Sequence, residues 1–164
     1  MFHKSIVLLF IIMSINSVSF AANPQEAAVT DNPYLTQAKQ FYAAQNYKGM
    51  QEVLFKGLAE YPKSSEIFYN LGVAYYKLGR PKLAVRSYEQ AIQLRPDFRE
   101  ARIGLASLYL DLKNYPKAMT QLKGLLKVDP TNPVIAEKLG LLYFNQKKYD
   151  EAATYFTKAI ELSP

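Results

Sequence analysis

Three glutamates recur along the chain at similar intervals, Glu66, Glu100 and Glu137. Paired carboxylates can act as the acid and the base of a glycosidase when two of them face each other across an enclosed cleft. The chain offers few other groups for such chemistry, because its one histidine is His3 and it has no cysteine. A Ser-His or Cys-His nucleophile and thiolate metal ligands are therefore missing. We expect no enzyme activity, no catalytic residues, no cofactor and no metal site.

Basic residues are concentrated in the middle of the chain. Residues 77–102 contain seven lysines and arginines against three acidic residues. Lys82 and Arg86, and likewise Lys123 and Lys127, are spaced so that each pair shares one side of a helix. The interpretation that we favour is a solvated outer face; the alternative is contact with an acidic partner or an anionic envelope surface. No element that reads nucleic-acid grooves accompanies these residues, so no nucleic-acid partner is expected.

The N-terminus resembles a secretory signal peptide. A short basic start, "MFHK", precedes the apolar run "SIVLLFIIMSI", and small residues at Ser19 and Ala21 form a cleavage site. The run is shorter than the roughly 20 residues of a membrane span, so we expect cleavage after Ala21, with an uncleaved N-terminal anchor as the alternative. Residues 1–21 are thus predicted to direct export to a bacterial periplasm. Residues 22–30 lack periodicity and are interpreted as a flexible lead-in.

The rest of the chain repeats itself with a period of 34 residues. Small, aromatic and large apolar residues recur in phase with the prolines. The columns are Pro62, Pro96, Pro130 and Pro164; Ala38, Gly72, Ala106 and Gly140; Phe41, Tyr75, Tyr109 and Tyr143; and Leu54, Tyr88, Leu122 and Phe156. The period predicts four structural units at residues 31–64, 65–98, 99–132 and 133–164.

Each unit is predicted to be a hairpin of two helices. In the second unit, Phe68, Leu71, Gly72 and Tyr75 share one helical face, and a second apolar pattern begins after Pro81. Between the two, Gly79 suits a left-handed position at the helix end. Asn32-Pro33 and Asn132-Pro133 are typical helix starts, and Asp97 with Glu100 forms a potential capping box.

These columns resemble the tetratricopeptide repeat, whose signature combines Leu-Gly, Tyr, Ala, an aromatic residue, Ala and Pro. The second unit carries it as Leu71-Gly72, Tyr75, Ala84, Tyr88, Ala91 and Pro96. The first unit departs most, with Gln37, Met50 and Gly57 at signature positions, and is interpreted as an N-terminal cap. The resemblance covers residues 31–164 and implies an all-α fold: an α-solenoid of four helix-turn-helix hairpins in a right-handed superhelical array.

The resemblance also implies a concave groove lined by the first helix of every hairpin. Apolar and aromatic residues recur on those helices, which favours the binding of a peptide or a partner helix. The alternative is that the side chains pack against one another. The predicted groove residues are Leu35, Lys39, Tyr42, Tyr69, Val73, Tyr76, Ile103, Ser107, Leu110, Glu137, Leu141 and Phe144. Of these, Tyr42, Tyr76, Leu110 and Phe144 are expected to form an exposed ladder.

The function predicted from the sequence is a non-enzymatic scaffold or adaptor of the bacterial cell envelope that binds a protein or peptide. One alternative is a self-associating structural protein, joined through the end of the array at "FTKAIELSP". There Phe156, Ile160 and Leu162 repeat apolar positions that the next hairpin covers in earlier units, so they form a possible second interface. Another alternative is an assembly co-factor that is anchored by an uncleaved N-terminal helix.

Overall fold

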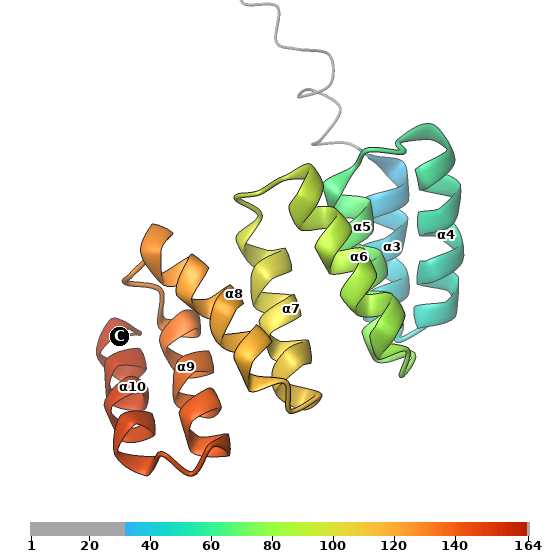
Figure 1. The fold of residues 1–164 in the computed structure, drawn as a ribbon. Coiled ribbons are helices and arrows are strands. Elements are labelled where there is room, and N and C mark those ends of the chain that lie inside the picture. Colours follow the sequence, from blue (N-terminus) through green and yellow to red (C-terminus); the bar gives the residue numbers. More distant parts are fainter. Residues whose placement is uncertain (1–31, 164) are drawn as a thin grey trace, which may run out of the picture. The chain divides into compact units, whose positions relative to one another are not determined.

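The computed structural model describes residues 32–163, and within this range eight α-helices alternate with short turns and no strand occurs (Figure 1). The predicted signal peptide, residues 1–21, and the predicted lead-in, residues 22–30, lie outside the described residues. The helices are α3 Pro33–Ala43, α4 Tyr47–Glu60, α5 Ser65–Lys77, α6 Pro81–Leu94, α7 Arg99–Asp111, α8 Tyr115–Val128, α9 Pro133–Asn145 and α10 Tyr149–Leu162.

Successive helices form antiparallel hairpins that stack in sequence order (Figure 1). Each predicted unit contains one hairpin: α3–α4, α5–α6, α7–α8 and α9–α10. The second helix of each hairpin also packs on the first helix of the next, and first helices contact first helices along the row α3, α5, α7 and α9. Within residues 32–163 the second helices make no such contacts with one another. This one-dimensional packing confirms the predicted α-solenoid.

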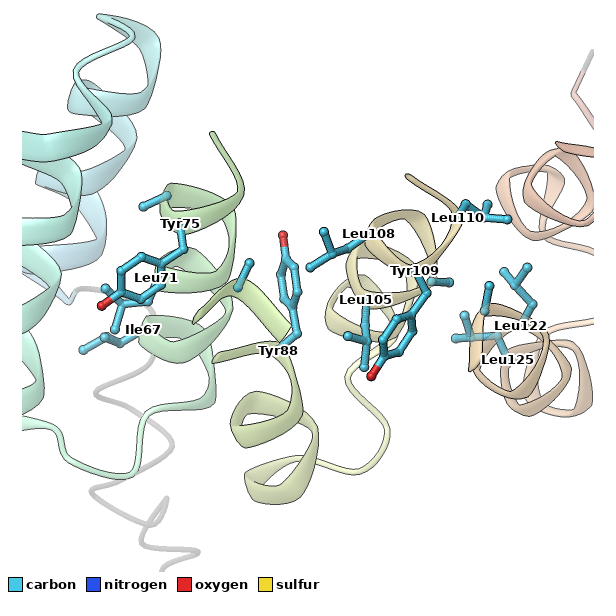
Figure 2. Close-up of a cluster of buried hydrophobic side chains, with 14 of the residues drawn as sticks. Ile67, Leu71, Tyr75, Tyr88, Leu105, Leu108, Tyr109, Leu110, Leu122 and Leu125 are labelled. Atoms are coloured by element: carbon cyan, nitrogen blue, oxygen red, sulfur yellow. The ribbon is translucent and has the colours of Figure 1, made fainter. Parts of the chain in front are cut away.

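The core is continuous from α3 to α9 because every first helix presents its apolar face to the helices on both sides. Ile67, Leu71 and Tyr75 are buried on α5, Leu105 and Leu108 on α7. Figure 2 shows these side chains pointing toward the space between neighbouring helices, with Leu122 and Leu125 of α8 continuing the cluster. The apolar spacing that predicted helices thus also supplies the contacts that hold the hairpins together.

The turn inside each hairpin uses the same backbone geometry. Gly79 has φ +67°, which confirms the predicted left-handed position. The residues one repeat away also have positive φ although they are not glycines: Gln45 at 55°, Lys113 at 57° and Lys147 at 61°. In every turn the next N–H donates to a carbonyl of the preceding helix, as Arg80 N does to Tyr75 O at 2.8 Å. This is the Schellman arrangement that closes a helix C-terminus.

The helix starts agree with the sequence at the prolines and differ at one predicted cap. Pro33, Pro81 and Pro133 are first residues of helices, and the Asn132 side chain accepts a hydrogen bond from Val134 N. The capping box predicted for Asp97 and Glu100 is wrong, because the residue before α7 is Phe98 and no side chain caps this helix.

The physical reason is that Phe98 anchors this helix start. Its ring is buried, lies 5.2 Å from that of Tyr69 and is covered by the Arg95 guanidinium at 3.5 Å. This packing sets the direction in which the chain enters α7, so a side-chain cap at Asp97 is not formed.

Candidate functional site

The first helices present one shared face to solvent. Because α3, α5, α7 and α9 contact one another in a row, their outward side chains form a continuous surface, which we call the inner face. All predicted groove residues belong to these four helices. Lys39, Tyr42, Tyr76, Glu137 and Phe144 are exposed; Leu35, Tyr69, Val73, Ile103, Ser107 and Leu141 are half-buried; Leu110 is buried.

The exposed ladder predicted for this face is interrupted in its third hairpin. Tyr42, Tyr76 and Phe144 expose 44%, 42% and 54% of their surface, whereas Leu110 exposes 8%. The prediction of an exposed Leu110 is therefore wrong. The Leu110 side chain belongs to the hydrophobic core instead, where it gains free energy by leaving water.

Two aromatic pairs stand at equivalent positions in the first and last hairpins. The ring of Tyr42 meets Tyr47 edge-on with centroids 5.9 Å apart, and Phe144 meets Tyr149 at 5.7 Å. Tyr47 and Tyr149 were not predicted as site residues, because they begin the second helices and the groove was assigned to the first. The recurrence of tyrosine at positions 47, 115 and 149, in phase with the 34-residue period, could have indicated them. Tyr42, Phe144 and Tyr149 are exposed and Tyr47 is half-buried, so exposed aromatic surface is present at both ends of the inner face.

Tyr76 links two neighbouring first helices. Its hydroxyl on α5 donates a hydrogen bond of 2.6 Å to Asp111 Oδ2 at the end of α7. This hydrogen bond, followed by burial and the charge of Asp111, raises the pKa of Tyr76 above its ordinary value. Asp111 was not predicted as a site residue, because the contact joins positions in adjacent repeats that only the stacking brings together.

Tyr69 lies in the middle of an aromatic row. Its ring is 5.9 Å from that of Tyr88 and 5.2 Å from that of Phe98. Burial, and then the charge of Glu100, raises the pKa of the Tyr69 phenol. The row therefore combines residues from α5, from α6 and from the start of α7, and two of its three rings, those of Tyr88 and Phe98, are buried.

The glutamates that opened the sequence analysis do not come together. Glu66 pairs with Arg95 at 2.6 Å and Glu137 with Lys138 at 3.4 Å, while Glu100 is exposed and has no ion pair within residues 32–163. The same part of the chain contains no cluster of three or more acidic, histidine or cysteine side chains that suits a metal ion. The basic pairs Lys82/Arg86 and Lys123/Lys127 are exposed on second helices, away from the inner face.

The three residues of the predicted second interface differ in how far they are exposed to solvent. Ile160 on α10 exposes 74% of its surface, whereas the equivalent Ile92 is half-buried beneath α7. Leu162 is half-buried, and Phe156 packs inside its own hairpin, where its ring would lie 2.7 Å from a Cβ at Gly140. The available apolar surface there consists mainly of Ile160.

The fold and the inner face together define a class of protein. It is a stacked array of helical hairpins whose inner face is aromatic and partly polar. Models of the tetratricopeptide repeat match residues 65–98, 100–132 and 138–164. The chain belongs to the tetratricopeptide repeat family. Such repeats serve as protein–protein interaction scaffolds, and this is the function that the family supports for the chain.

Curated relatives are much longer proteins. The human protein O-mannosyl-transferase TMTC1 is 31% identical over 132 residues, which cover 75% of this chain and 14% of that protein. A tetratricopeptide repeat and J domain-containing co-chaperone, DNJ1 of Cryptococcus neoformans, is 22% identical over 96% of this chain and 31% of its own length. The chain thus spans less than a third of either protein.

Solved structures share the fold at low identity. The crystal structure of MamA superposes with a TM-score of 0.72 at 24% identity, covering 84% of this chain and 83% of the other. YrrB, described as a TPR protein with an unusual peptide-binding site, gives a TM-score of 0.70 at 24% identity, covering 80% and 68%. Within residues 32–163 no helix is long and apolar enough to cross a membrane.

Proposed function

We propose that the chain is a non-enzymatic adaptor that binds a peptide or helix of a partner protein on its inner face. The observation that carries this proposal is the set of exposed rings on the first helices, Tyr42, Tyr76 and Phe144. Exposed aromatic side chains gathered on one face usually mark interaction sites, and Tyr is enriched at the energetic centres of interfaces. YrrB, a neighbour in fold, is described as having an unusual peptide-binding site, which supports peptide binding as the kind of function.

The chemistry of the inner face also favours binding over catalysis. Its carboxylates are spread over α5, α7 and α9, and those of Glu66 and Glu137 are engaged in ion pairs. A hydrolytic pair needs two carboxyl groups within about 5–10 Å across the substrate. The match to the O-mannosyl-transferase covers 14% of that enzyme, so it supports shared repeats and no shared reaction.

The test compares partner capture by matched variants of the full chain. A tagged chain is used to capture proteins from an envelope extract, beside the triple variant Tyr42→Ala/Tyr76→Ala/Phe144→Ala. The control is Phe55→Ala, which removes a ring that is 45% exposed on the second helix α4. We expect the triple variant to lose partners that the wild type and the Phe55 variant retain. If all three capture the same proteins equally, the assignment of the inner face is wrong.

The location that we propose is the periplasm of the bacterial cell envelope. The support is the three-part layout of residues 1–21, with a basic start, an apolar run and a small-residue cleavage site. Mass spectrometry of the protein purified from its own cells tests it. An N-terminus at Ala22 supports cleaved export, whereas an intact N-terminus in the membrane fraction supports the anchored alternative.

Self-association is a second candidate, and the 74% exposure of Ile160 favours it. Light scattering of the full chain at several concentrations, with Ile160→Lys as the comparison, tests this candidate. A dimer that dissociates in the variant supports it, and a monomer at every concentration excludes it.

A further inference from the structure

The second helices of the last two hairpins, α8 and α10, each expose a narrow stripe of side chains to solvent (Figure 1). The stripe follows positions i, i+1, i+4, i+7 and i+11, which lie on one side of a helix. The α8 stripe consists of Pro116, Lys117, Thr120, Lys123 and Lys127, all of them exposed. The α10 stripe, one 34-residue period later, consists of Asp150, Glu151, Thr154, Thr157 and Glu161, which are also exposed.

The two stripes carry opposite charge. The α8 stripe has three lysines and no carboxylate, whereas the α10 stripe has three carboxylates and no cation. The remaining charged residue of α10, Lys158, is half-buried and lies outside the stripe. The equivalent positions of α6 are mixed, because they hold Lys82 and Arg86 together with Glu89. The separation of charge is therefore particular to the last two hairpins.

Lysines also occupy the turns that precede the two helices. Lys113 lies before α8, and Lys147 and Lys148 lie before α10. The Lys148 ammonium lies 5.9 Å from the centroid of the Tyr143 ring on α9. These turns dilute the charge of the α10 stripe at its N-terminal end. The opposition of charge is therefore clearest at the C-terminal ends of the helices.

The charges of the stripes are not neutralised within the described part of the chain. None of the six charged stripe residues forms an ion pair there. The helices α8 and α10 do not contact each other, because α9 lies between them. Two of the uncharged residues are already satisfied, since Thr120 Oγ1 and Thr154 Oγ1 each donate to the carbonyl four residues earlier at 3.0 Å. The lysines and carboxylates can thus pair with charges of another molecule.

A positive stripe beside a negative stripe is complementary to a second copy of itself. A two-fold axis that runs along the helices, between α8 and α10, places α8 of each copy on α10 of the other. Rotation about this axis keeps every residue at its height along the helix, so that residues one period apart face each other. Lys127 then faces Glu161 of the second copy, and Lys117 faces Glu151. The symmetry makes each contact twice.

We propose that two copies of this chain associate through α8 and α10, with the lysine stripe of each on the carboxylate stripe of the other. The contact uses two helices from each copy and charges that are exposed in the monomer, so we expect a weak dimer that dissociates as salt is added. This inference goes beyond the proposed function, because the stripes lie on second helices and include neither the inner face nor Ile160. Both inner faces remain free, so the dimer can hold a partner with two sites more tightly than a monomer can.

Charge reversal and its rescue test the contact in the full chain. Sedimentation velocity over a range of concentrations, at low and high salt, measures the dimer Kd. Lys127→Glu and Glu161→Lys each turn two attractive contacts of the dimer into repulsive ones, so each should raise the Kd about tenfold or more. The double variant Lys127→Glu/Glu161→Lys restores opposite charges at the contact and should recover the wild-type Kd.

The matched control is Lys82→Glu, the same change of charge at an exposed position of α6, outside both stripes. It should leave the Kd unchanged. Melting temperatures of the four variants establish that all are folded.

The proposal is overturned by a wild-type chain that stays monomeric at every concentration. It is also overturned if the dimer tolerates both single reversals, or if the double variant is as weak as the single ones, because Lys127 and Glu161 then do not face each other. A dimer that dissociates in Ile160→Lys but not in the charge variants would place the contact at the end of the array. None of these outcomes bears on the inner face, which partner capture by the Tyr42/Tyr76/Phe144 variant tests separately.

Discussion

The ring of Tyr88 occupies the space that a side chain at Gly72 needs. A Cβ at residue 72 would lie 2.6 Å from Tyr88 Cε1 and 2.7 Å from Cδ1, well inside normal contact. The close crossing of α5 and α6 therefore depends on the absence of a side chain at this position. The same relationship recurs in the last hairpin, where Phe156 lies on Gly140.

Gly72→Leu should destabilise the fold by more than the roughly 1–3 kcal/mol typical of overpacking, and Gly72→Ala should also destabilise it. The matched control is Gly124→Ala on α8, where an added Cβ meets nothing within 4 Å. This change should stabilise the protein by about 0.5–1 kcal/mol through helix propensity alone. Urea unfolding of the three variants measures both effects, and an unchanged stability of Gly72→Leu would show that the register is wrong.

The 34-residue period is sufficient to predict the helical hairpins, because the residues in its columns act locally or between the two helices of one hairpin. Gly72, Tyr75 and Ala84 belong to this group. The inner face was harder to predict. The partnership of Tyr76 with Asp111 and the passage of Tyr88 beside Gly104 depend on how one hairpin stacks on the next, and the 34-residue period does not encode that offset. The burial of Leu110 was equally hard to predict, because this residue occupies a ladder position in the repeat but packs in the core.

The left-handed turn positions provide a second stability test. Gln45, Lys113 and Lys147 adopt positive φ in turns where the second hairpin has Gly79. A non-glycine residue in this conformation costs about 1 kcal/mol or more. Lys113→Gly should therefore leave stability unchanged or raise it by up to about 1 kcal/mol, despite the added freedom of the unfolded chain. Gly79→Ala should lower it by a similar amount. Thermal unfolding measures both, and a stabilised Gly79→Ala protein would contradict the left-handed assignment.

The second and third hairpins begin differently, because a side chain caps α5 and none caps α7. Mutations at the two helix starts should therefore have different effects on stability. Ser64 Oγ accepts a hydrogen bond from Ile67 N at 3.2 Å, so Ser64→Ala should cost about 1 kcal/mol of stability. Asp97→Ala should cost less than about 0.5 kcal/mol, because α7 begins without a side-chain cap. Chemical unfolding of both variants gives the comparison. A larger loss for Asp97→Ala than for Ser64→Ala would restore the capping box predicted from the sequence.

The raised pKa of Tyr109 predicts how the stability of the fold falls in alkaline solution. Burial, the charge of Glu89 and the hydrogen bond to Glu89 Oε1 raise the pKa of Tyr109 to about 12 from its ordinary 10.0. The folded state therefore holds the phenol proton more tightly than the unfolded state does. This contribution to stability is fully present below pH 10.0 and is lost as the pH rises toward about 12.

The measurement is urea unfolding of wild type and Tyr109→Phe at pH 8 and pH 11. At pH 8 the variant should be less stable, because it lacks the hydrogen bond of 3.1 Å to Glu89. Between the two pH values it should lose less stability than the wild type, because phenylalanine has no proton to release. All other groups are the same in both proteins, so the difference between the two losses isolates Tyr109. Equal losses would show that the Tyr109 phenol titrates as it does in the unfolded chain.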